Sequence, residues 1–153
     1  MIAPANLHVT LNFIGEVSDQ EVGRLSGICR ELAAEAAPIP ATLTGLGLLP
    51  SAARPRVVCL GVRDGAGELR TLADTLRLRL GGQGDRRFLA PAFLAHVTLA
   101  RVRRVPRQTG ERLCRVRLPP AHGTFRSLVL YQSVLQGGGA TYRPLQTAEL
   151  VGG

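Results

Sequence analysis

Two copies of the string His-Val-Thr-Leu, at positions 8–11 and 96–99, contain two of the chain's three histidines. An imidazole titrates near neutral pH, so two histidines beside one substrate can supply a general acid and a general base. The hydroxyls of Thr10 and Thr98 can donate hydrogen bonds to phosphate oxygens on which charge builds during a reaction. These residue types indicate acid–base chemistry on a phosphate ester, for which we expect no metal ion or other cofactor.

Strands must position these side chains. Both strings lie in apolar, β-branched runs, which predict strands at about Asn6–Ile14 and Phe93–Val102. Side chains alternate between the two faces of a strand, so each histidine shares a face with the threonine two residues further on. Two such strands lying side by side would present both imidazoles and both hydroxyls to a single cleft. The residues expected on the opposite, core-facing side are Leu7, Val9, Leu11, Val97 and Leu99.

A histidine on a strand is by itself a weak sign of catalysis, because most such residues are structural or surface side chains. A four-letter repeat can also arise by chance. The matching histidines and the matching strand contexts together favour a functional site. The third histidine, His122, lacks the His-x-Thr context and precedes Gly123, so we expect it to be a surface or loop histidine.

The residues after the two strings extend the pattern. The sequence NFIGEV follows at positions 12–17, and an Ala-Arg pair follows the second string at 100–101. With Phe125, a strand predicted at Leu128–Leu135 and the closing segment Gly139–Leu145, the chain resembles the 2H phosphoesterase superfamily. Within it, the chain is most similar to the LigT-like RNA 2′,3′-cyclic phosphodiesterases, also called 2′-5′ RNA ligases. The paired motifs make this resemblance specific.

The resemblance implies an α+β fold of two pseudo-symmetric lobes. Their antiparallel sheets would flank a central cleft, with helices on the outside and the two motif strands facing each other across the cleft. Relatives usually begin with a strand and a helix before the first motif, so we expect that this sequence lacks that N-terminal segment. At 153 residues, the chain has the length of a single domain.

The resemblance also implies a reaction, the hydrolysis of a terminal 2′,3′-cyclic phosphate of RNA to a 2′-phosphate. His96 would take a proton from water, and His8 would give one to the departing 3′ oxygen. Thr10 and Thr98 would hold the non-bridging oxygens, and Arg101 would contact the phosphate. Strict alternation places Arg101 on the face opposite His96, so a bulge or the strand's end must redirect it.

Three alternatives stay open. The substrate can be a smaller cyclic nucleotide or an ADP-ribose cyclic phosphate rather than an RNA 3′ end. A truncated lobe can leave an inactive module that only binds RNA ends or nucleotides. The two His-Thr pairs can also lie far apart as structural residues.

Composition bounds the class of protein. The formal net charge is +8, and all 19 basic residues are arginine. A GC-rich genome is the simplest explanation, although guanidinium groups also favour polyanionic partners such as RNA.

Cys29, Cys59 and Cys114 are widely spaced, which indicates neither a disulfide framework nor a zinc site. The sequence has no signal peptide and no apolar run that could span a bilayer, and we expect a cytoplasmic monomer.

The remaining pattern alternates helices with hairpins. Ser18 and Glu21 have the spacing of a capping box before a helix at Asp19–Ala36. A second helix starts at about Asp64 and closes at Gly81-Gly82. The other expected elements are hairpins at Ile39–Leu48 with Val57–Val62 and at Thr124–Gln136 with Ala140–Leu150, and a short helical or irregular segment at Thr109–Arg117.

Overall fold

The computed structural model of the chain describes residues 2–81, 93–103, 105–136 and 139–153. The chain divides into two compact units, each assembled from three separate parts of the sequence. We name them the motif unit, with Met1–Thr10, Pro40–Arg70 and Leu94–Gly123, and the helix–hairpin unit, with Leu11–Ile39, Thr71–Phe93 and Thr124–Gly153. Both His-Val-Thr strings have their histidine and threonine in the motif unit.

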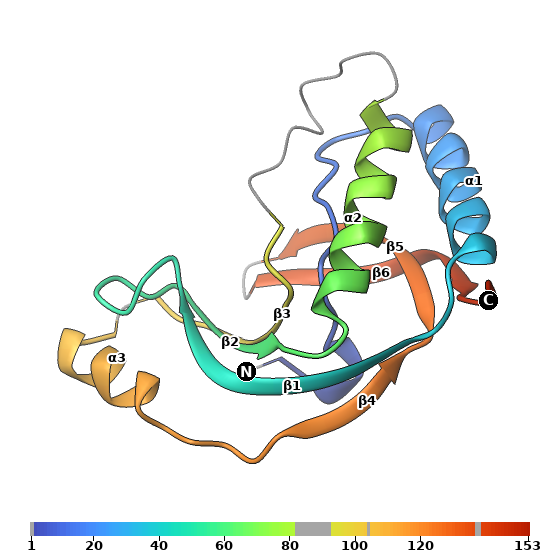
Figure 1. Ribbon diagram of the computed structural model, residues 1–153. Helices are drawn as coiled ribbons and strands as arrows, with labels where there is room; N and C mark the ends of the chain where they lie inside the picture. Colours follow the sequence, from blue (N-terminus) through green and yellow to red (C-terminus); the bar gives the residue numbers. More distant parts are fainter. Residues whose placement is uncertain (1, 82–92, 104, 137–138) are drawn as a thin grey trace. The chain divides into compact units, whose positions relative to one another are not determined.

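The main element of the motif unit is a four-stranded sheet with the strand order β3-β2-β1-β4 (Figure 1). Its strands are β1 at Ile39–Leu49, β2 at Val57–Val62, β3 at His96–Arg101 and β4 at Ala121–Phe125. The pairing of β2 with β1 and of β2 with β3 is antiparallel. The strands are rich in Val, Leu and Thr, which pack well on a pleated surface.

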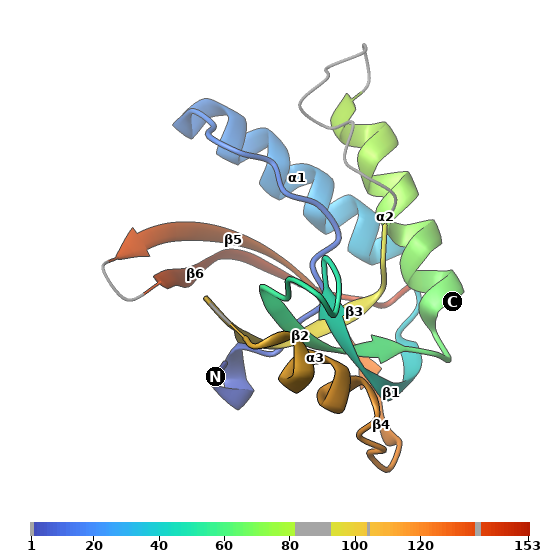
Figure 2. The same ribbon diagram turned by 90° about the vertical axis from the view of Figure 1, so that its left-hand side faces the viewer.

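Helix α3, at Arg107–Cys114, lies against the loop that joins β1 to β2 (Figure 2). A Cβ atom on Gly110 would collide with the backbone carbonyl of Ala52, so this close approach requires glycine. The contact holds the β1–β2 loop beside the segment that follows β3.

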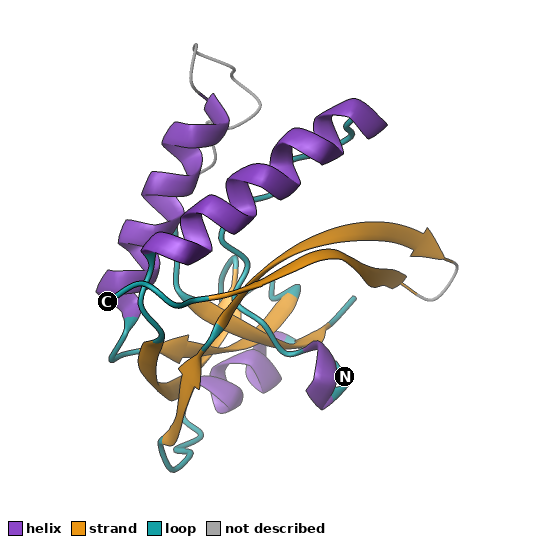
Figure 3. Ribbon diagram, turned by 90° about the vertical axis from the view of Figure 1, so that its right-hand side faces the viewer, coloured by secondary structure: helices purple, strands orange, loops and turns teal. Residues whose placement is uncertain are grey.

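In the helix–hairpin unit, α1 at Asp19–Glu35 packs on the hairpin of β5, Ser127–Gln136, and β6, Gly139–Glu149 (Figure 3). The helix begins with the predicted capping box, in which the backbone N–H of Glu21 donates to Ser18 Oγ at 3.3 Å. In return, the Ser18 N–H donates to Glu21 Oε2 at 3.0 Å. The two bonds satisfy donors that the first helical turn leaves unpaired.

The core of the helix–hairpin unit is built around Leu25 of α1 and Leu80 of α2, a helix at Ala66–Gly81. Each of the two leucines is 4% exposed. The apolar side chains packed against this pair are Ile14, Val17, Ile28, Leu76 and Leu130. Helical spacing in α1 and α2 and strand alternation in β5 therefore converge on one apolar cluster.

Several sequence-based expectations are confirmed. The protein is α+β with antiparallel sheets. The first helix, the second helix and both hairpins lie where the periodicity predicts them. No helix among the described residues combines the length and apolarity needed to cross a bilayer. The second glycine of the expected Gly81-Gly82 helix end lies outside the described residues.

The two motif strands are shorter than expected. A 3₁₀ helix, η1 at Pro4–Asn6, replaces the start of the first, and only Val9 makes a bridge. The second is limited to β3. Leu7, expected in the core, is 43% exposed, because the η1 turn precedes it and one bridge does not extend a full buried strand.

The prediction of one long strand from Thr124 was wrong. His122 is exposed, as expected, but it lies in a strand and not in a loop. Residues 121–125 form β4, which pairs with β1, and β5 starts only at Ser127 in a different sheet. Arg126 separates the two strands, and its carbonyl accepts a hydrogen bond from Leu150 N–H at 2.7 Å. Alternating polarity continues across this change of sheet, so periodicity alone cannot reveal it.

Replacing Leu25 with alanine should destabilise the protein by about 2–5 kcal/mol, because it removes apolar contacts and leaves a cavity beside Leu80. Urea unfolding followed by circular dichroism measures the change. Leu78→Ala is the control, since Leu78 is 76% exposed, and should change stability by less than about 0.5 kcal/mol. Equal losses in the two variants would contradict the assigned core.

Candidate active site

A bridge between Val9 and Val97 joins the two motifs in an antiparallel pair. Extending this register by one residue in each direction places His8 opposite Thr98 and Thr10 opposite His96. Residues opposite each other in a sheet share a face, and neighbours along a strand alternate faces. The two histidines and two threonines therefore lie on one face, which we call the His-Thr face, and the two valines lie on the other.

The two motif segments lie side by side within one unit, joined at Val9 and Val97. The pairing makes His8 and His96 diagonal neighbours, with Thr10 and Thr98 on the other diagonal. Diagonal residues of an antiparallel pair are separated by about 7–8 Å, and directly opposite residues by about 5 Å.

The two imidazoles are held in the same way. His8 Nδ1 lies 2.7 Å from the carbonyl oxygen of Asn6, and His96 Nδ1 lies 2.8 Å from that of Leu94. A carbonyl oxygen can only accept, so each Nδ1 carries the hydrogen that it donates. Each Nε2 then holds the lone pair of the neutral ring or the second proton of the charged one. Both rings are half-buried, and either can act as an acid or a base.

Arg101 joins the His-Thr face because β3 contains one extra residue. Thr98 pairs with Cys59, but Ala100 pairs with the next residue of β2, Val58, so Leu99 is bulged out of the ladder. After the bulge, Arg101 pairs with Val57. Val57 is two residues from Cys59 in β2, so the two residues share a face of the sheet. The bulge that the resemblance required is therefore present, and it turns Arg101 to the side of Thr98.

Small residues lie beside His96 and Thr98 on the neighbouring strand. Gly61 pairs with His96, and Cys59 pairs with both Thr98 and Gly47. A Cβ atom on Gly47 would lie only 3.0 Å from Cys59 Sγ. Cys59 is buried, and this burial raises the pKa of its thiol, so it serves as a small apolar residue rather than a nucleophile.

The family model described as the 2′-5′ RNA ligase superfamily matches residues 2–136. The chain belongs to this superfamily. A member from Archaeoglobus fulgidus named RNA 2′,3′-cyclic phosphodiesterase is 33% identical over 150 residues, which cover 97% of this chain and 82% of that protein.

Two solved structures resemble the chain. The protein TT0787 of Thermus thermophilus has a TM-score of 0.78 at 29% identity, covering 99% of this chain and 81% of that one. E. coli LigT complexed with 3′-AMP has a TM-score of 0.71 at 29% identity, covering 97% and 79%. These matches confirm the resemblance that the two motifs indicated.

This member of the 2′-5′ RNA ligase superfamily has a second polar cluster in the motif unit, which sequence patterns did not indicate. Thr42, 4% exposed, has its Oγ1 3.1 Å from His122 Nδ1. Hydrogen bonds from Arg63 and Thr42 lower the pKa of the Asp64 carboxyl. These residues come from three separate segments of the chain, so no local sequence motif predicts that they cluster. Among the described residues, no three His, Cys, Asp or Glu side chains gather as metal ligands.

We predict that neutral His8 and His96 are both protonated on Nδ1, because each Nδ1 faces a carbonyl. Two-bond ¹H–¹⁵N correlation spectra recorded at alkaline pH distinguish the tautomers. His122 is the internal comparison, since its Nδ1 faces a hydroxyl that can either donate or accept. An Nε2-protonated ring at position 8 or 96 would contradict the assigned geometry.

Proposed function

We propose that the chain hydrolyses the terminal 2′,3′-cyclic phosphate of RNA, leaving a 2′-phosphate. The observation that carries this proposal is the antiparallel Val9–Val97 bridge, whose register supports a placement of both imidazoles and both hydroxyls on one face. Relatives named RNA 2′,3′-cyclic phosphodiesterase support the same activity. We infer further that the chemistry is performed by the two histidines without a metal ion.

Hydrolysis requires attack in line with the departing oxygen, so the base and the acid must lie on opposite sides of the phosphorus. His8 and His96 occupy opposite corners of the four-residue group. In the proposed step, His96 Nε2 removes a proton from water as the new P–O bond forms. His8 Nε2 delivers a proton to the 3′ oxygen as the old bond breaks. Exchange with solvent then restores neutral His96 and charged His8.

The hydroxyls occupy the other two corners, where they can donate hydrogen bonds to the non-bridging oxygens. These oxygens gain charge in the transition state, so donors fixed beforehand stabilise it more than they stabilise the bound substrate. Arg101, on the same face beyond the bulge, adds a charged donor. A guanidinium can bind two oxygens of one phosphate at once.

Replacing His8 or His96 with alanine should lower kcat about a hundredfold to ten-thousandfold, the usual loss of a general acid or base. The assay is hydrolysis of a dinucleotide ending in a 2′,3′-cyclic phosphate, with folding checked by circular dichroism. His122→Ala is the matched control and should retain near-parental turnover. A chelator should leave the parental rate unchanged. Near-parental turnover by either motif variant would rule out the two-histidine mechanism.

The pH profile provides a second readout of these roles. Because the base must be neutral and the acid charged, the parental kcat/KM should be bell-shaped in pH. Removal of the base in His96→Ala should abolish the fall on the acidic side, and removal of the acid in His8→Ala the fall on the alkaline side. The opposite pattern would exchange the two roles.

Arg101→Gln should lower kcat/KM about tenfold to hundredfold, because a hydrogen bond to a charged group contributes about 1.5–3 kcal/mol. The same dinucleotide assay measures it. Arg117→Gln, an exposed arginine in the loop before β4, removes the same charge away from the His-Thr face. If the two variants lose activity equally, Arg101 acts only through net charge.

A further inference from the structure

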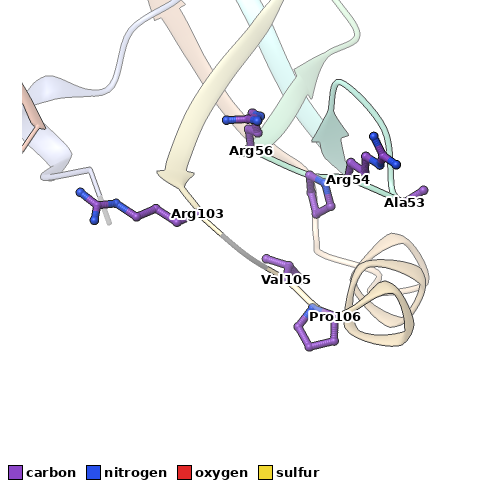
Figure 4. Close-up of a pocket in the computed structure, with 7 residues that line it drawn as sticks. Ala53, Arg54, Arg56, Arg103, Val105 and Pro106 are labelled. Atoms are coloured by element: carbon purple, nitrogen blue, oxygen red, sulfur yellow. The ribbon is translucent and has the colours of Figure 1, made fainter.

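An open pocket of about 470 Å³ lies in the motif unit, beyond the end of β3. Its lining residues come from the loop before β2 and from the segment after β3, and they are Ala53, Arg54, Pro55, Arg56, Arg103, Val105 and Pro106 (Figure 4). Three of the seven are arginines, and none is acidic. The described function does not use any of them.

The pocket continues the strand pair that carries the His-Thr face. Val102 N–H donates to the carbonyl oxygen of Arg56 at 2.9 Å, which extends the β2–β3 pairing past Arg101. The next step of this register sets Arg103 opposite Pro55, with the same parity as Arg101. Backbone pairing thus connects the proposed reaction site to the arginine pocket within one unit.

The three guanidinium groups are available to an anion. Arg54, Arg56 and Arg103 are exposed. Within the described part of the chain, the ion pairs join other residues, Arg63 with Asp64, Arg77 with Asp74 and Arg79 with Glu35. Arginines without carboxylate partners at a pocket rim attract phosphate, because the guanidinium matches its oxygens.

The arrangement suits a chain of phosphates better than a single one. In Figure 4, Arg103 and Arg54 lie on opposite sides of the pocket, and the Arg103 guanidinium points away from Arg54 and Arg56, so the three groups do not converge on one point. Arg103 is five residues beyond Thr98, further along the chain than the His-Thr face. A longer RNA strand can contact the His-Thr face and these arginines at once. The 3′ end carries the cyclic phosphate, so such a strand continues only in the 5′ direction.

We propose that this pocket is a subsite for the phosphodiester backbone of the RNA strand on the 5′ side of the cyclic phosphate, so that oligonucleotides are better substrates than mononucleotides. This inference rests on the proposed function, because the subsite would affect the hydrolysis of the cyclic phosphate. Apolar Val105 and Pro106 complete the pocket wall and can pack against a ribose or a base.

The test compares a triple variant, Arg54→Gln, Arg56→Gln and Arg103→Gln, with the parental protein on substrates of one, two, four and eight nucleotides that end in a cyclic phosphate. The variant should lose about tenfold to hundredfold in kcat/KM on the octanucleotide, mainly through KM, and match the parental protein on the mononucleotide. The salt dependence of octanucleotide binding should also weaken by about 2 in log–log slope, since each phosphate contact contributes about 0.7 on single strands.

A matched control removes the same charge elsewhere, through Arg24→Gln, Arg70→Gln and Arg117→Gln, all exposed and outside the pocket. An equal loss in the control and pocket variants would overturn the subsite. So would an equal loss on the mononucleotide and the octanucleotide. Substrates in which one phosphodiester is replaced by a neutral methylphosphonate supply a test on the parental protein. The length preference should fall when the neutral linkage occupies the pocket and should persist if the pocket binds no phosphate.

Direct binding separates this inference from the proposed function. Fluorescence anisotropy with a labelled octanucleotide bearing a 2′-phosphate requires no turnover. If the parental protein binds this RNA through the three arginines but hydrolyses no cyclic phosphate, the proposed function fails and the subsite is supported. If the protein hydrolyses the substrates but the pocket variant binds and reacts like the control, only the subsite is overturned.

Discussion

The candidate site depends on how the edge of β3 is paired. On one side β3 pairs with β2, and on the other it is bridged by Val9 and bonded by Ile2, whose N–H donates to the Leu99 carbonyl at 2.8 Å. An unpaired strand edge would expose backbone donors and acceptors. The first motif satisfies part of that edge, and this pairing determines which four side chains share a face.

The extra residue at Leu99 adds a second constraint. A regular strand cannot place residues five apart on one face, because side chains alternate with a period of two. One bulged residue reverses the alternation, so that His96, Thr98 and Arg101 all pair with β2 residues of one parity. Ile2 donates its hydrogen bond to the carbonyl of the bulged residue, which contributes to holding the irregularity in place. A single insertion thereby combines the charge of Arg101 with the acid–base pair.

Local geometry prepares both histidines identically, although they are 88 residues apart in sequence. Each imidazole donates from Nδ1 to the carbonyl two residues earlier. This bond needs only an extended backbone before the histidine, so the repeated sequence context produces it twice. The helix–hairpin unit contains none of these groups. In that unit, α1 buries Leu25, Cys29 and Leu32.

Much of this protein was determined by its sequence alone. Apolar periodicity located α1, α2 and the two hairpins, because burial depends on spacing along a single element. The repeated His-x-Thr pattern identified His8, His96, Thr10 and Thr98 as candidates, and strand alternation put each pair on one face. The sequence did not predict that β4 and β5 belong to different sheets, because the alternation of polarity continues through Arg126 while the chain moves to another sheet.

Only the tertiary structure decided how the two motifs meet. Which residue pairs with which across a sheet depends on contacts between distant segments, so the Val9–Val97 register and the bulge at Leu99 have no local signature. The same holds for the arginine pocket. Composition showed that every basic residue is arginine, but only the folded loop before β2 brings Arg54 and Arg56 beside Arg103. Spacing within one segment is encoded locally, whereas proximity between segments is a property of the folded chain.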